Sequence, residues 1–210
     1  MPGGINFCIF SRHATLVELL LYTTADCPEP FQVIVLDPEH NRSFFYWHVL
    51  VEGLPPGTCY TWRADGPQDT AQTGRAFHPH KNLLDPHARA VSVALWDRAM
   101  ATDPQHTGHA SMRAIVADPM GPREAHAPRQ LGDAVIYELH VGGFTRHPSS
   151  GARYPGTFLA LIEKIPYLVE LGVTHVELMP VMAFDEQQVP DPVAARGLRN
   201  YWGYSTHSCY

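Results

Sequence analysis

Four ionisable side chains lie in two apolar runs of the sequence, at spacings that could support chemistry. In a strand, alternation places Glu138 and His140 on one face, and His175 and Glu177 on one face of the second run. Two facing carboxylates could hydrolyse a glycoside, and two His with two Glu could hold a metal ion. We favour a structural role, because mid-strand polar groups usually satisfy one another and catalytic groups lie at strand ends.

The segment after the second apolar run carries polar and aromatic side chains suited to ligand contact. It passes Asp185 and Glu186 and reaches the run Asn200-Tyr-Trp-Gly-Tyr204. The apolar face of a sugar ring matches an aromatic plane, and its hydroxyl groups need polar neighbours. We therefore predict that Tyr204 and Trp202 bind substrate. The alternative is that the aromatic side chains only pack the loop onto the strands.

The elements that must position these residues form a βαβ pattern. Residues 134–141 and 173–181 predict buried strands, and residues 157–171 have the period of a helix. A crossover of this length requires the two strands to be parallel. Strands this apolar need cover on both faces, so the pattern predicts the opening of a larger α/β domain that is cut short at Tyr210.

The first 65 residues have a different pattern, with short β-rich runs separated by turn residues about every ten positions. The predicted strands are 5–10, 16–22, 31–36, 44–51 and 58–65. This spacing predicts an all-β sandwich. Phe45 with Trp47, and Tyr60 with Trp62, alternate on two of the runs. We expect them to form core, with a sugar-stacking platform as the alternative.

Between the two halves the periodicity disappears. Residues 82–91 predict a short helix or turn packed on the sandwich, and residues 99–130 predict a linker folded over the surface. His106, His109 and His126 lie in this linker. Their spacing matches no metal-ligand motif, so we interpret them as solvated loop histidines and expect no metal site.

The composition of the 210 residues excludes several classes of protein. Fifteen Lys and Arg against twenty-one Asp and Glu give a net charge of −6, which argues against a nucleic acid or an anionic membrane as the main partner. No apolar run approaches the roughly 18 residues of a membrane span. Cysteines at positions 8, 27, 59 and 209 form no CxxC pair. They predict reduced, mostly buried thiols in a cytoplasmic protein that needs no cofactor.

Several motifs in both halves belong together. In the second half they are Asp133-Ala-Val-Ile-Tyr-Glu-Leu-His140, Pro155-Gly-Thr-Phe158, Glu177-Leu-Met-Pro180 and Asn200-Tyr-Trp-Gly-Tyr204. In the first half they are Gly4-Ile-Asn-Phe-Cys-Ile-Phe-Ser11, Arg63-Ala-Asp-Gly-Pro67 and Leu84-Asp-Pro86. This combination resembles the isoamylase and glycogen debranching enzyme group of the α-amylase family, glycoside hydrolase family 13.

The resemblance implies an architecture in three parts. Residues 1–98 would form an early-set, immunoglobulin-like β-sandwich similar to a glycan-binding module, and residues 99–132 a linker. Residues 133–210 would form the first βαβ portion of a (β/α)8 TIM barrel, truncated after its second strand.

The resemblance also implies retaining hydrolysis of α-1,6 branch linkages in glycogen, limit dextrin or starch-like glucans. In the family, an Asp after the fourth barrel strand and a Glu after the fifth carry the reaction. No position of this sequence matches either residue, so we assign no catalytic residue and expect the chain alone to be inactive. Tyr204 matches the family's Tyr that stacks on the sugar at the cleavage subsite.

Two alternatives remain open at this point. A trehalose-forming or branching relative would have a similar first barrel strand and a comparable Trp-Gly-Tyr segment, although residues 151–157 and 200–202 favour debranching. A non-catalytic glucan-binding protein would instead use the sandwich. Replacing Trp47 or Trp62 by Ala would then weaken binding to glycogen.

Overall fold

The computed structural model describes residues 3–106, 108, 110–118 and 131–208. The chain divides into two compact units, one of residues 1–119 with 207–210 and one of residues 120–206. In the described part of the chain, every helix is too short or too polar to cross a lipid bilayer.

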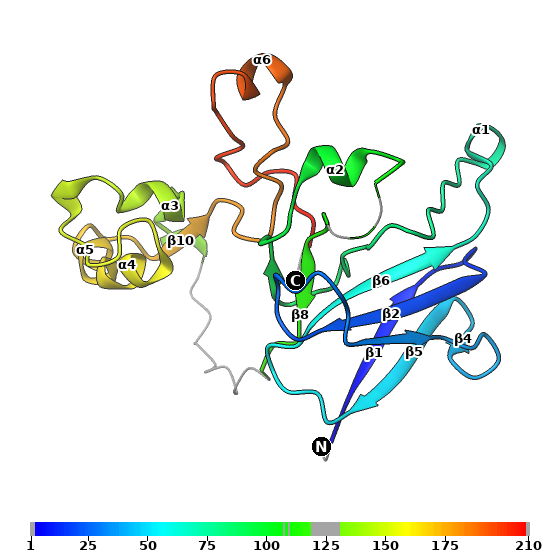
Figure 1. Cartoon of the computed structure of the whole chain (residues 1–210). Helices are drawn as coiled ribbons and strands as arrows, with labels where there is room; N and C mark the ends of the chain where they lie inside the picture. The colour runs from blue at the N-terminus through cyan, green and yellow to red at the C-terminus, as the bar shows by residue number, and fades with distance from the viewer. Residues whose placement is uncertain (1–2, 107, 109, 119–130, 209–210) are drawn as a thin grey trace. The chain divides into compact units, whose positions relative to one another are not determined.

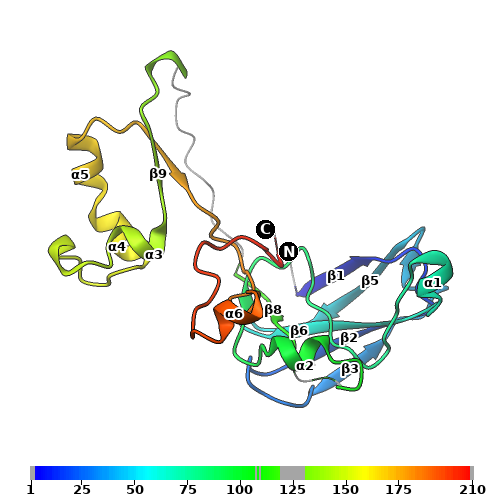
Figure 2. The same ribbon diagram turned by 90° about the horizontal axis from the view of Figure 1, so that it is seen from above.

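The first unit is a sandwich of two antiparallel sheets (Figures 1 and 2). One sheet has the strand order β1-β5-β4 and the other has the order β3-β2-β6-β8-β7. The strands are β1 (Gly4–Phe10), β2 (Leu16–Tyr22), β3 (Gln32–Val35), β4 (Arg42–Ser43), β5 (Tyr46–Glu52), β6 (Cys59–Asp65), β7 (Val91–Ser92) and β8 (Arg113–Ile115). The sandwich predicted from the sequence is confirmed.

The core lies between the two sheets, where alternation directs one face of each strand inward. Leu19 and Leu21 of β2 pack with Trp47, Tyr60 and Trp62 in one buried cluster. Trp47 and Trp62 are 0% exposed, so neither ring offers a face to a sugar. The prediction of core packing is confirmed for Trp47, Tyr60 and Trp62, and the alternative of a sugar-stacking platform is wrong for both tryptophans. For Phe45 the prediction is wrong, because it lies half-buried in the turn before β5 and outside the core cluster.

The structure differs from the sequence prediction over the expected linker. Strand β8 lies in that stretch and pairs with β6 and β7, and Met112, Arg113 and Ala114 are buried. The Arg113 guanidinium carbon lies 3.7 Å from the centre of the Tyr22 ring, and Nη1 donates to the Thr24 carbonyl at 3.1 Å. A three-residue strand is too short to show a period, and an arginine in it suggests solvent, which is why the sequence did not indicate β8.

The segment 82–91 forms turns and a bridge, so the turn alternative of its prediction holds. The Leu83 and Trp62 main chains exchange hydrogen bonds of 2.8 and 2.9 Å, which ties the segment to β6. Ala88 is buried in the core cluster. Two short helices, α1 (Thr70–Thr73) and α2 (Arg98–Thr102), complete the unit.

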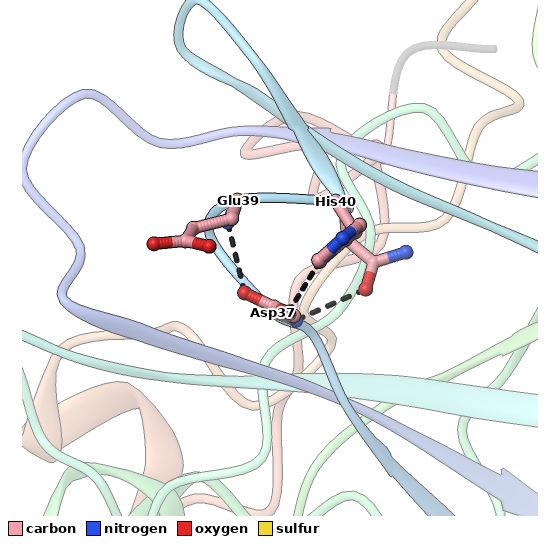
Figure 3. Close-up of polar contacts among 4 residues, drawn as sticks. Asp37, Glu39 and His40 are labelled. Carbon is pink, nitrogen blue, oxygen red and sulfur yellow. Dashed lines mark hydrogen bonds and ion pairs between the residues drawn. The ribbon is translucent and has the colours of Figure 1, made fainter.

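The turn between β3 and β4 is held by side chains that hydrogen-bond to nearby main chain and to each other (Figure 3). Asp37 Oδ1 accepts from the Glu39 amide at 2.9 Å, and Oδ2 lies 2.6 Å from His40 Nδ1. Asn41 Oδ1 accepts from the Asp37 amide at 3.0 Å. The hydrogen bonds from Glu39 and then His40 lower the pKa of the Asp37 carboxyl.

The second unit is built on two parallel strands, β9 (Ile136–Leu139) and β10 (His175–Leu178), in which Glu177 lies opposite Glu138. The predicted parallel pair is confirmed. The helices of the second unit are α3 (Val141–Phe144), α4 (Phe158–Glu163), α5 (Ile165–Glu170) and α6 (Asp191–Ala194). It also has 3-10 turns at Leu131–Asp133 and Pro148–Ser150.

The single helix predicted over 157–171 is two helices. Thr157 caps α4, because its Oγ1 accepts from the Ala160 amide at 3.3 Å. The break falls at Lys164, between α4 and α5. Pro166 has no amide hydrogen to donate and its ring blocks the preceding turn, so it fits only the first turn of a new helix.

Candidate functional site

A cleft of about 700 Å³ lies in the second unit where the two parallel strands end. Its wall includes His140 and Gly142, directly after β9, and Pro180, which follows β10. Further wall comes from Arg146 and Phe158, and from the segment 184–201, which includes Asn200 and Tyr201. In α/β folds this edge, outside the carboxyl ends of the strands, is the usual place for ligands.

His140 lies at the junction of three segments. Strand β9 ends at Leu139, so His140 is a strand-end residue and not the mid-strand residue that the sequence predicted. Nδ1 accepts from the Gly143 amide at 3.0 Å and thereby caps α3. Nε2 lies 2.9 Å from the Tyr201 carbonyl oxygen, and the two rings stack with centroids 4.4 Å apart.

Asn200 organises the loop that borders the cleft. Its Nδ2 donates to the Tyr204 carbonyl at 2.6 Å and to the Asp185 carbonyl at 3.3 Å. Its amide donates to the Glu186 carbonyl at 2.9 Å. Asp185 is fully buried, and its Oδ1 accepts from the Gln187 amide at 2.9 Å. These contacts close residues 185–204 into one hydrogen-bonded loop.

The charged groups of the cleft come from both of its sides. Arg146, beyond α3, donates from Nε to the Gly142 carbonyl at 3.2 Å. Glu186 and Arg199 form an ion pair of 3.5 Å in which both side chains are exposed. An exposed pair of this kind contributes little to stability, so these side chains can reorient toward a polar ligand.

The two residues predicted to bind substrate lie on this loop with open rings. Trp202 and Tyr204 are each 57% exposed. The Trp202 ring lies 6.4 Å from the His140 ring, edge to face. The cleft wall itself includes Asn200 and Tyr201 instead. The residue types of this run indicated the aromatic side chains. They did not indicate that Asn200 holds the loop together, because that role depends on its contact with Asp185.

The four mid-strand candidates do not assemble into a metal centre. Within residues 3–106, 108, 110–118 and 131–208, no three His, Cys, Asp or Glu side chains gather as metal ligands would. Glu138 and Glu177 are neighbours in register and exposed, and His175 Nδ1 lies 2.8 Å from Thr174 Oγ1. His109 and His126, two of the three linker histidines, fall outside the described residues.

The described cysteines are free, and the expectation that they are mostly buried is wrong. Cys59 is buried, Cys27 is half-buried and Cys8 is exposed. Cys8 alternates outward on an edge strand of the sandwich, so solvent reaches it. Cys209 lies outside the described residues.

An exposed aromatic group, not indicated by the sequence, lies at one end of the three-stranded sheet and in the adjoining turn between β4 and β5. Phe10 and Tyr46 face each other across β1 and β5, with ring centroids 5.4 Å apart, and they are 55% and 52% exposed. Phe44, 82% exposed, has a φ of 62°. Arg42 Nε donates to the Phe44 carbonyl at 3.0 Å and fixes this turn. We call Phe10, Phe44 and Tyr46 the outer aromatic group.

Comparisons with known proteins agree with this architecture. Residues 1–88 match the family model described as carbohydrate-binding module 48 (isoamylase N-terminal domain). The chain is 39% identical, over 98% of its length, to isoamylase 3, chloroplastic, of Oryza sativa subsp. japonica. It is 37% identical, over 99% of its length, to the glycogen debranching enzyme of Yersinia enterocolitica. The chain is a homologue of the isoamylases and glycogen debranching enzymes. The resemblance seen in the motifs is confirmed.

This isoamylase homologue spans only part of its relatives. It covers 27% of the rice isoamylase 3 and 31% of the Yersinia enzyme. The fold is also similar to solved structures. The glycogen-degrading pneumococcal virulence factor SpuA matches with a TM-score of 0.65 and 26% identity, over 86% of this chain and 18% of SpuA. Apo pullulanase from Paenibacillus barengoltzii matches with a TM-score of 0.65 and 26% identity, over 90% of this chain and 27% of the pullulanase.

Proposed function

We propose that this chain is the N-terminal part of a debranching glycosidase that hydrolyses α-1,6 branch linkages of glycogen or starch-like glucans. The observation that carries the proposal is the similarity to isoamylases over 98% of the chain and to a glycogen debranching enzyme over 99% of it. The names of these relatives favour debranching over a trehalose-forming or branching activity. The parallel strands β9 and β10 would then open a (β/α)8 barrel, with the cleft on its active face.

In this proposal the chain contributes binding and not bond cleavage. The family's nucleophile and acid/base match no residue of this sequence, so the residues at hand can only hold the glucan. Tyr204 and Trp202 offer open aromatic rings on the loop, and Asn200, Arg146 and Glu186 offer hydrogen-bonding groups in the cleft wall. Such a set suits a ring with one apolar face and a hydroxyl-rich edge.

Titration of the 210-residue chain with a branched maltooligosaccharide, followed by NMR, tests this assignment. We expect Trp202→Ala and Tyr204→Ala each to raise the Kd about fivefold, the loss of roughly 1 kcal/mol of stacking. Tyr154→Ala is the matched control, because Tyr154 is 44% exposed on the same unit and lies outside the loop 185–204. An unchanged Kd in both loop variants would contradict the assignment.

A second candidate function, glucan binding by the sandwich, is favoured by the outer aromatic group. The match of residues 1–88 to a carbohydrate-binding module supports it. Since Trp47 and Trp62 are buried, the stacking faces would come from Phe10, Phe44 and Tyr46. Phe44 is held in the left-handed region at φ 62°, where a residue other than glycine is strained. A conformation that costs about 1 kcal/mol and exposes a phenyl ring points to function.

Phe44→Gly separates binding from folding. Glycine adopts a positive φ without strain, so we expect the variant to keep or raise the thermal midpoint of the sandwich while losing co-sedimentation with glycogen. Phe31→Ala is the control, since Phe31 is exposed beside the other sheet. Wild-type co-sedimentation by Phe44→Gly and by Tyr46→Ala would exclude the outer aromatic group as a glucan site.

A further inference from the structure

The contacts of His140 determine which ring nitrogen carries the proton. A backbone amide can only donate and a carbonyl can only accept. Because Nδ1 lies 3.0 Å from the Gly143 amide, Nδ1 must be unprotonated. Because Nε2 lies 2.9 Å from the Tyr201 carbonyl oxygen, Nε2 must hold the hydrogen. A neutral imidazole with its proton on Nε2 satisfies both contacts at once.

We propose that His140 is a positioning residue for glucan binding, and that its Nε2–H ties the loop carrying Trp202 and Tyr204 to the end of β9. The tie acts on the main chain of Tyr201, next to Trp202, and the stacked Tyr201 ring prevents the imidazole from turning away. The cap on α3 fixes the other edge of the ring. The imidazole is thus held at both nitrogens and on one face.

This arrangement matters because the two aromatic residues are positioned through the main chain of their loop. Trp202 and Tyr204 are largely exposed, and Asn200 restrains the Tyr204 carbonyl but not the Trp202 ring. A side chain that must stack on a sugar loses rotational freedom on binding, and prior restraint of its backbone reduces that cost. The role in glucan binding rests on the proposed function, whereas the tautomer and the tie to the loop do not.

The tautomer is tested directly on the wild-type chain. The 15N signals of the His140 ring should show an unprotonated, pyridine-type Nδ1 and a protonated, pyrrole-type Nε2, assigned by their loss in His140→Asn. The signals are read on wild type, and their loss in His140→Gln gives a second, independent assignment. A proton on Nδ1 in the neutral ring would overturn the proposal.

Two substitutions then separate the two contacts of the ring. In His140→Asn, Oδ1 occupies the place of Nδ1 and can keep the cap on Gly143, but nothing reaches Tyr201. In His140→Gln, Nε2 can still donate to the Tyr201 carbonyl, while the cap is lost. A residue that merely fills space would disturb both segments equally in both variants.

The reporters are two amides that hydrogen exchange follows separately. Gly143 reports the cap, and Asn200, whose amide donates to the Glu186 carbonyl, reports the loop. The Gly143 amide also donates to the His140 carbonyl oxygen at 3.0 Å, so loss of the cap removes only one of its two acceptors. We expect at least tenfold faster exchange at Asn200 in His140→Asn and about threefold faster exchange at Gly143 in His140→Gln, with the other amide unchanged. Equal acceleration at both amides in both variants would overturn the proposed role of the hydrogen bond from His140 Nε2 to the Tyr201 carbonyl.

Binding of the branched maltooligosaccharide gives the last comparison. We expect His140→Asn to raise the Kd about fivefold and His140→Gln to leave it within twofold of wild type. If the Gly143 and Asn200 amides respond separately as expected but His140→Asn binds like wild type, the positioning role in glucan binding is overturned. The hydrogen bond between His140 and the loop is then still supported. If wild type itself does not bind, the proposed function of the cleft fails instead, and the exchange data still decide the tie.

Discussion

Asp85 is the buried carboxylate on which two of the largest aromatic side chains of the sandwich converge. Its Oδ2 accepts from Tyr60 Oη at 3.0 Å and from Trp62 Nε1 at 3.4 Å, and its Oδ1 accepts from the His87 amide at 2.8 Å. Three donors compensate for the cost of burying the charge. Burial, and then the negative charge of Asp85, raise the pKa of the Tyr60 hydroxyl.

This shift makes the sandwich less stable in alkali. In the unfolded chain a tyrosine ionises near pH 10, whereas folded Tyr60 keeps its proton to higher pH. The unfolded state therefore binds fewer protons than the folded state above about pH 10, and the free energy of unfolding falls as pH rises. Tyr60→Phe removes this dependence but also removes the hydrogen bond to Asp85.

Urea unfolding at pH 8 and pH 11 checks the expectation. At pH 8 we expect Tyr60→Phe to be less stable than wild type by about 1 kcal/mol, the value of one hydrogen bond. At pH 11 the difference should shrink or change sign. Loss of hydration, partial at Cys8 and greater at Cys59, also raises the pKa of these two thiols, but both proteins contain them, so their effect cancels. A difference that is the same at both pH values would refute the assignment to Tyr60.

At the scale of elements, the sequence predicted the strands that have a regular period and missed those that depend on distant contacts. The parallel pair and the long strands of the sandwich follow from alternation and turn residues. Strand β8 does not, because its three residues are specified by pairing with β6 and β7. The break at Lys164 could have been predicted from Pro166 alone.

In the candidate site, too, the sequence indicated what residue types specify locally and missed what depends on distant contacts. The aromatic run that carries Trp202 and Tyr204 was visible in the sequence, because residue types alone suggest stacking. The contact between His140 and Tyr201 was not, since it joins residues 61 positions apart. Contacts of that kind depend on how a loop returns to the strand ends, which no local pattern specifies.

The loop that carries these aromatics depends on a close approach at Gly203. Gly203 has a φ of 82°, and a Cβ there would lie 2.7 Å from the Pro180 carbonyl oxygen. Gly197 has a φ of 71° with nothing within 4 Å of a Cβ. Alanine at either position is strained by about 1 kcal/mol, but only at Gly203 must the backbone also move.

We therefore expect Gly203→Ala to open the loop and Gly197→Ala to leave it nearly closed. Cleavage by thermolysin between residues 196 and 206, followed by mass spectrometry, measures the difference. Gly203→Ala should be cut several-fold faster than Gly197→Ala, which controls for the strain of a positive φ. Equal rates would mean that the contact with Pro180 does not hold the loop.

At the scale of the whole molecule, the two units differ in how much apolar surface they bury. The sandwich buries residues on both faces of β6, including Thr61 and Trp62 at 0% exposure. In the described part of the second unit, the buried apolar residues are Leu139, Ala160 and Leu168, while Ile136 and Ile162 are exposed. Few buried apolar contacts mean a low free energy of local opening.

Native-state hydrogen exchange on the whole chain should therefore separate the units. We expect the amides of β2 and β6 to exchange at least a hundredfold more slowly than those of β9 and β10, because a difference of about 3 kcal/mol in opening free energy gives that ratio. Both sets are measured in one sample, which removes any difference in conditions. Trp62→Phe, which loosens the sandwich core, should accelerate β2 and β6 and leave β9 and β10 unchanged. If all four strands exchange at one rate, and respond together to that substitution, the chain unfolds as a single cooperative unit and the second unit draws its stability from the first.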